Sequence, residues 1–76
     1  MAINKAKDEY EYELLIKMGE ANDLNRDMQS VETFRAYKNA QGNLRVRVFN
    51  LDRFVREIKP KEFQKEFNDI KKRFNE

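Results

Sequence analysis

Hydrophobic residues in the first part of the chain recur at intervals of three and four, the spacing of one face of an α-helix. The members of this stripe are Tyr10, Leu14, Leu15, Met18 and Ala21. Gly19 and the pair Asn22-Asp23 are typical helix stop signals. The pattern therefore predicts a helix over about residues 5–21, followed by a polar connector up to residue 30.

Residues 31–49 predict an antiparallel hairpin. Residues 31–38 are rich in strand formers, residues 44–49 alternate apolar and basic side chains, and the loop between them contains Gly42, where a positive φ is easy. Alternation along the strands separates two faces. One face carries Phe34, Ala36, Leu44, Val46 and Val48. The other face carries Arg35, Tyr37, Arg45, Arg47 and Phe49.

Two helices are predicted after the hairpin. The spacing of Phe54, Val55 and Ile58 indicates a helix over about residues 52–58. Pro60 ends it, because proline lacks the amide donor, and suits the first position of another helix over about residues 60–75. The apolar stripe of that helix is Phe63, Phe67, Ile70 and Phe74. The predicted fold is α+β in the order α-β-β-α-α, a single small domain over residues 1–76 with helices on the apolar face of the hairpin.

The charge is unevenly divided between the two halves of the sequence. Residues 1–32 carry four basic and eight acidic residues, a net charge of −4, and residues 33–76 carry twelve basic and six acidic residues, a net charge of +6. This division predicts either one acidic and one basic surface, or two segments that neutralise each other in the folded protein.

The residue inventory argues against catalysis. The chain has no His and no Cys, which removes the usual general base, the thiolate nucleophile and the common zinc ligands. Asp23-x-Asn25-x-Asp27 begins like a calcium loop, but Met28 stands where the turn-forming glycine belongs. We expect a protein that is not an enzyme and that needs no cofactor and no metal.

The basic face of the hairpin is the first candidate site. Its residues, extended past the second strand, are Arg35, Tyr37, Arg45, Arg47, Phe49 and Arg53. Arginines neutralise phosphates and exposed aromatic rings stack on bases, so the pattern favours binding to DNA or RNA by a small regulatory or accessory protein. Lys38 and Arg56 are candidates to extend the patch. The structural alternative is a solvated sheet face whose rings are shielded by arginine stems.

A protein partner is the alternative function. The stripe of Phe63, Phe67, Ile70 and Phe74 either completes the core or binds a partner's groove or a second copy of the chain. The acidic first helix offers a second docking surface for a basic protein, with Asp8, Glu9, Glu11 and Glu13 flanked by Tyr10 and Tyr12. A phage- or plasmid-type inhibitor or adaptor fits this reading.

Residues 34–54 resemble the wing and closing helix of small winged-helix proteins of the excisionase type. The resemblance rests on Phe34-Arg-Ala-Tyr37, the loop with Gly42, Arg45-Val-Arg47 and Leu51-Asp-Arg-Phe54. It implies that the hairpin contacts DNA, although the compact helix-turn-helix of that family is not evident in residues 14–30.

The hydrophobic runs are short. None approaches the roughly 20 residues that span a bilayer, and the polar stretch after Met1 has no signal-peptide core. We therefore expect a cytoplasmic protein, or one in the host cytoplasm if it is phage-encoded, with no membrane partner.

Overall fold

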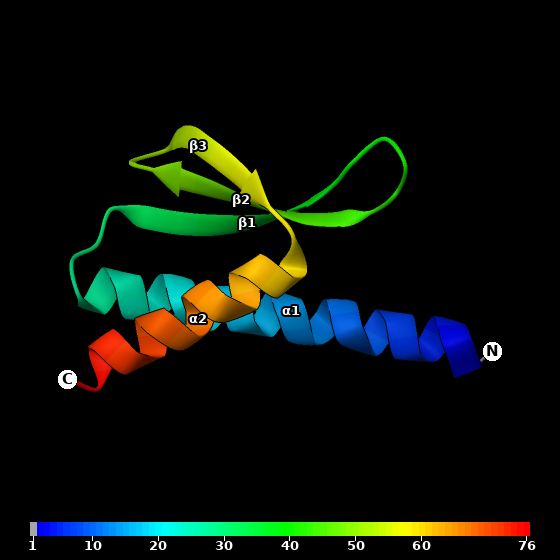
Figure 1. The fold of residues 1–76 in the computed structure, drawn as a ribbon, viewed down its shortest axis with the longest axis horizontal. Helices are drawn as coiled ribbons and strands as arrows, with labels where there is room; N and C mark the ends of the chain where they lie inside the picture. Colours follow the sequence, from blue (N-terminus) through cyan, green and yellow to red (C-terminus); the bar gives the residue numbers. More distant parts are fainter. Residues whose placement is uncertain (1) are drawn as a thin grey trace.

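The computed structural model describes residues 2–76, with side chains described from residue 9 onward. The chain runs through α1 (Ala2–Asp27), β1 (Glu32–Lys38), β2 (Leu44–Asn50), β3 (Arg53–Ile58) and α2 (Pro60–Phe74). The strands form one antiparallel sheet in the order β1-β2-β3, and both helices lie on the same side of it (Figure 1). The predicted α+β class is confirmed, but the order is α-β-β-β-α. Neither helix of this described region has an apolar stretch long enough to cross a membrane.

The predicted helix over residues 52–58 is wrong, because this segment forms β3. Leu51 and Asp52 have φ angles of 49° and 67°, and two successive left-handed residues are what a two-residue type I′ hairpin turn requires. A bulge in the pairing with β2 leaves Val55 outside the cross-strand register, so apolar residues do not alternate and their spacing resembles that of a helix. The closing helix of the winged-helix resemblance is therefore also absent from this segment.

α1 continues to Asp27, past the predicted end at residue 21. Leu24 and Met28 pack against the core, and this burial offsets the weak helix preference of the asparagines and aspartates around them. The last helix matches its prediction. Lys59 is extended at the N-cap, Pro60 occupies the first turn, and the Glu62 side chain accepts a hydrogen bond from the Lys59 backbone N–H at 3.3 Å.

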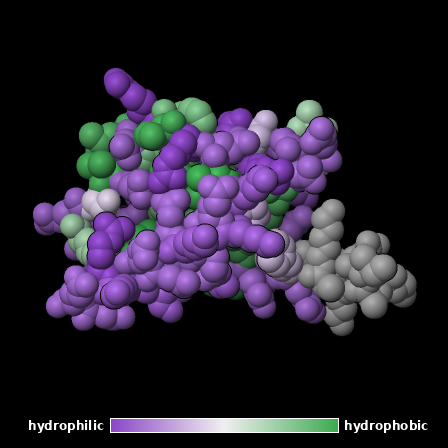
Figure 2. Space-filling model, viewed as in Figure 1, coloured by the Kyte–Doolittle hydropathy of each residue, from purple (hydrophilic) through white to green (hydrophobic). Residues whose placement is uncertain are grey.

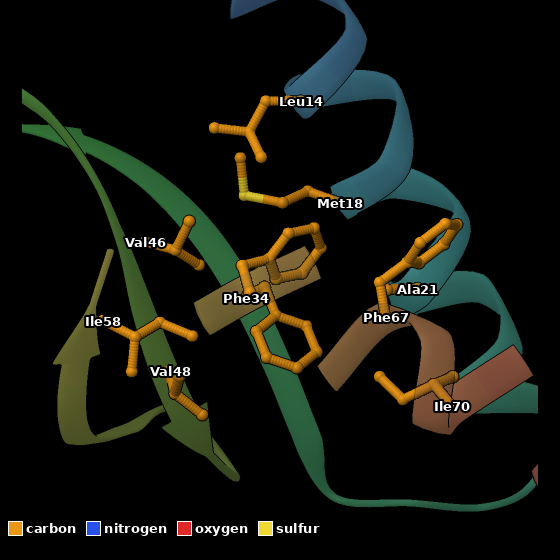
Figure 3. Close-up of a cluster of buried hydrophobic side chains, with 10 residues drawn as sticks. Leu14, Met18, Ala21, Phe34, Val46, Val48, Ile58, Phe67 and Ile70 are labelled. Carbon is orange, nitrogen blue, oxygen red and sulfur yellow. The ribbon is translucent and has the colours of Figure 1, made fainter. Parts of the chain in front are cut away.

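The hydrophobic core fills the layer between the sheet and the helices (Figure 3). Its buried members are Leu14, Met18, Ala21, Phe34, Val46, Val48, Ile58, Phe63, Phe67 and Ile70. The rings of Phe34 and Phe63 meet edge to face, with centroids 5.1 Å apart and planes at 72°. Every strand and both helices therefore contribute to one core, and β2 is anchored by Val46 and Val48 at its centre.

Two asparagines of α1 close the free edge of β1. The Asn22 Nδ2 donates to the Phe34 carbonyl oxygen at 3.0 Å, and its Oδ1 accepts from the Phe34 N–H at 2.8 Å. The Asn25 Nδ2 donates to the Glu32 carbonyl oxygen at 3.1 Å. Asn22 thus makes the pair of bonds that a neighbouring strand would make. An edge with unpaired backbone groups recruits other chains, so these side chains both hold α1 to the sheet and block that edge.

We expect Asn22→Ala to lower the free energy of unfolding by about 2 kcal/mol or more, because it removes the partners of both the N–H and the C=O of Phe34. Asn22→Asp keeps the acceptor for the Phe34 N–H but turns a carboxylate oxygen toward the Phe34 carbonyl oxygen, so it should also be destabilising. Urea denaturation followed by circular dichroism measures both. Asn68→Ala is the control, since Asn68 is exposed and bonds only the Gln64 side chain. Equal losses at positions 22 and 68 would contradict this account of the edge.

The β2–β3 turn yields a second expectation. A bulky residue in the left-handed region costs about 1 kcal/mol, and the turn type prefers Asn-Gly. The double substitution Leu51→Asn and Asp52→Gly should therefore raise the free energy of unfolding by about 1 kcal/mol. Gly42→Ala, at φ +78°, should lower it by a similar amount. Thermal melts of both variants test the assignment, and a destabilised Asn-Gly variant would count against it.

Candidate functional site

The sheet face opposite the helices is the candidate site. We call it the outer face, and alternation along the paired strands assigns to it Thr33, Arg35, Tyr37, Arg45, Arg47, Phe49, Phe54 and Glu57. Within the described chain, both helices pack on the opposite side, so this face lies open to solvent (Figure 1). The site is therefore built on three rigid strands rather than on a loop.

Two arginines are opposed at the centre of the outer face. Arg35 on β1 and Arg47 on β2 are direct cross-strand partners. Like charges in directly opposed positions destabilise a sheet. Glu57 on β3 is the next residue in the row, and the Arg47 Nε donates to its Oε1 at 3.4 Å. The outer face thus has one carboxylate for three arginines, and it keeps an excess of positive charge.

Aromatic rings support the arginines. The Arg47 Cζ lies 3.5 Å from the ring centroid of Tyr37 and 5.7 Å from that of Phe54, and the Arg35 Cζ lies 5.1 Å from that of Phe49. The rings of Phe49 and Phe54 also meet edge to face, 6.0 Å apart. Cation–π attraction of this kind holds a guanidinium in place and leaves the N–H groups at its edge able to bind a planar anion, apart from the Arg47 Nε–H that bonds Glu57. The outer face therefore presents arginines in fixed positions.

The structure brings most of the predicted site residues together. Arg35, Tyr37, Arg45, Arg47 and Phe49 share the outer face. The Arg45 Nη1 donates to the carbonyl oxygen of Leu44 at 2.8 Å, which engages part of its guanidinium. Arg53 does not belong to the outer face. It pairs with Asn50, next to the outer-face pair of Phe49 and Phe54, and side chains of successive residues alternate between the two faces. Arg53 is therefore directed to the helix side of the sheet.

Sequence reasoning missed Phe54 and Glu57, because β3 was predicted to be a helix. Both residues belong to the outer face only through the pairing of β3 with β2. One signal could have found them. The strand formers Phe54 and Val55 stand one residue after Leu51-Asp52, a two-residue gap that follows the second strand.

Lys38 and Arg56, which alternation directs to the helix side of the sheet, are each paired with an acid. The Lys38 Nζ lies 3.3 Å from Glu11 of α1. Arg56 donates two hydrogen bonds to Glu66 of α2, at 2.9 and 2.7 Å, and its Nη2 lies 3.8 Å from Glu32. The hydrogen bond with Glu66 raises the pKa of Arg56, so this charge is firmly held. Lys38 and Arg56 therefore join sheet to helices and do not extend the outer face.

The alternative site on the last helix is largely buried. Phe63, Phe67 and Ile70 belong to the core, and only Phe74 of the predicted stripe is exposed. The acidic first helix does keep an open surface, where Tyr12 is well exposed, but its Glu11 is paired with Lys38. The side chain of Asp8 lies outside the described residues.

A hydrophobic corner lies at the β2–β3 turn. Leu51 is 77% exposed, and Val31, Phe54 and Val55 are each about half exposed. The Leu51 N–H donates to the Val31 carbonyl oxygen at 3.1 Å, which brings this turn beside the start of β1. Figure 2 shows a hydrophobic area over this end of the sheet, in a surface that is otherwise mainly hydrophilic.

In the part of the chain that the structure describes, no three His, Cys, Asp or Glu side chains cluster in a way that could hold a metal ion. Comparisons of the chain with family models, with curated proteins and with solved structures found no match.

The same substitution should have opposite effects at the two opposed arginines. Arg35→Glu gives up the contact with Phe49, but it replaces the repulsion of Arg47 by an attraction, and a cross-strand pair of opposite charges contributes about 0.2–1 kcal/mol. We expect its free energy of unfolding to equal or exceed that of the wild type. Arg47→Glu gains the same cross-strand pair with Arg35, but it loses both the stack on Tyr37 and the ion pair with Glu57 and then opposes two carboxylates. It should therefore lower this free energy by about 1 kcal/mol or more. Urea denaturation at low salt measures both, and a shared sign would contradict the assigned pairing.

Proposed function

We propose that this chain is a small, non-enzymatic regulatory or accessory protein that binds nucleic acid, DNA or RNA, through the outer face. The observation that carries the proposal is the opposed pair of Arg35 and Arg47, each held on an aromatic ring. A phosphate group placed between two guanidinium groups accepts hydrogen bonds from both and neutralises their repulsion.

The cost of this arrangement supports a binding role. A sheet face that serves only solubility can mix charges of both signs across neighbouring strands, which stabilises the fold. The outer face instead opposes two arginines, while Lys38 and Arg56 on the helix side are matched with carboxylates of α1 and α2. Departures from local stability rules cluster at functional sites, so the unmatched charge points to an anionic ligand.

A protein partner is the second candidate, and the hydrophobic corner is the observation that favours it. Leu51 projects from a turn whose backbone lies in the left-handed region, and 77% of its surface is exposed. The Phe-rich helix offers less, since three of its four stripe residues are in the core. A phage- or plasmid-type adaptor that contacts a protein with this corner and nucleic acid with the outer face is compatible with both surfaces.

Arg35→Glu should separate binding from folding. We expect the substitution to weaken nucleic-acid binding by at least about tenfold at low salt, because it removes one phosphate contact and adds repulsion, while the fold is kept. Fluorescence anisotropy of labelled oligonucleotides at two salt concentrations measures the affinity. Wild-type binding should weaken steeply with salt.

The matched control is Lys61→Glu, which makes the same change in net charge on α2, on the other side of the sheet. It should change the affinity by about twofold or less, since only the overall charge of the protein is altered. Equal losses in the two variants, or wild-type binding that is insensitive to salt, would exclude the outer face as the binding surface. A wild-type protein that binds no oligonucleotide at low salt would exclude the function itself.

A further inference from the structure

The arrangement of arginines over aromatic rings bears on which nucleic acid the outer face accepts. We propose that it docks in the major groove of B-form duplex DNA, with Arg35 and Arg47 directed at base edges and adjacent phosphates. This inference rests on the proposed function and specifies its ligand.

Two of the three rings of the outer face, those of Tyr37 and Phe49, already carry an arginine. Modules that bind single strands offer open ring faces on which successive bases stack. Here the Arg47 guanidinium lies 3.5 Å from the centroid of Tyr37, and that of Arg35 lies 5.1 Å from the centroid of Phe49. A base could stack on these faces only by displacing an arginine and giving up its cation–π attraction. The geometry therefore favours recognition by guanidinium groups over recognition by base stacking.

Paired guanidinium groups suit the edges of guanines. Arginine that donates two hydrogen bonds to O6 and N7 of guanine is the commonest specific contact in the major groove. A stacked arginine is pre-oriented for such a planar contact, and less side-chain entropy is lost when it binds. Beside the arginines, Phe54 is about half exposed, and phenylalanine is among the side chains that contact the thymine methyl group in the same groove. The outer face thus combines donors and an apolar surface of the kind that this groove presents.

The width of the sheet can be compared with the widths of the grooves of DNA and RNA. Adjacent strands lie about 4.8 Å apart, so the backbones of β1 and β3 lie about 10 Å apart. The major groove of B-form DNA is about 12 Å wide and the minor groove about 6 Å. The major groove of A-form RNA is deep and too narrow for side chains to read. Of these grooves, the major groove of duplex DNA is therefore the one wide enough to admit the side chains that project from the outer face.

The test compares four labelled probes of one mixed sequence by fluorescence anisotropy with the full-length protein. The probes are duplex DNA, its single strand, the corresponding duplex RNA, and duplex DNA whose cytosines are glucosylated 5-hydroxymethylcytosine, which fills the major groove with sugar. We expect the plain DNA duplex to bind at least about tenfold more tightly than each of the other three. Netropsin, which occupies the minor groove, should leave duplex binding unchanged.

A conservative variant tests the role of the guanidinium. Arg47→Lys keeps the charge but loses the planar fork and the stack on Tyr37. It should weaken binding to the plain duplex by about tenfold and reduce the preference over the glucosylated duplex, with little change in salt dependence. The corresponding control, Lys61→Arg on α2, should match the wild type.

The outcomes separate the two proposals. A single strand that binds as tightly as the duplex, or a glucosylated duplex that binds as well as the plain one, overturns the groove assignment. If that binding is still weakened by Arg35→Glu, nucleic-acid binding by the outer face stands. Absence of binding to all four probes at low salt overturns both.

Discussion

The contact between Asn22 and Phe34 joins the parts of this fold. The amide of Asn22 bonds both backbone groups of Phe34, the Phe34 ring packs against Phe63, and its Cα lies opposite Val48 in the sheet. One strand residue is thus tied to α1 by its backbone, to α2 by its side chain and to β2 by register. Because buried backbone groups need partners and buried rings need dense packing, the position of either helix cannot shift without a loss at Phe34.

The uncovered sheet face follows from this one-sided packing. A chain of 76 residues supplies apolar side chains for a single layer between helices and sheet. Asn22 and Asn25 bind α1 to the edge of β1. The buried residues Phe63, Phe67 and Ile70 hold α2 in the same core. No described helix therefore remains to cover the other face. That face must be stable in water, and arginines laid over aromatic rings meet this requirement because the guanidinium shields the ring and stays hydrated at its edge.

The sequence predicts those parts of the fold in which local pattern and tertiary packing agree. The strands around Gly42 alternate cleanly, and the stripe of α2 follows Pro60, so the hairpin, the last helix and five of the outer-face residues are found from spacing. The third strand is not predicted from the sequence, because the bulge at Val55 breaks its alternation and because Leu51-Asp52 lacks the glycine that normally marks such a turn. The end of α1 is predicted too early, because Asn22 and Asn25 are typical turn formers in the sequence. In the structure their side chains instead hydrogen-bond the backbone of β1.

The third strand changes the chemistry of the outer face. The turn at Leu51 and Asp52, together with the bulge, sets the register that places Phe54 beside Phe49 and Glu57 beside Arg47. Without β3, the opposed arginines would have no carboxylate in their row, and the cross-strand repulsion would be largest. With β3, Glu57 holds the Nε of Arg47 and leaves the terminal amino groups for a ligand. The left-handed backbone of Leu51 is unfavourable, but the turn it forms brings Glu57 beside Arg47. Glu57 neutralises part of the positive charge, so the strands stay paired. The arginines of the outer face still outnumber its single glutamate.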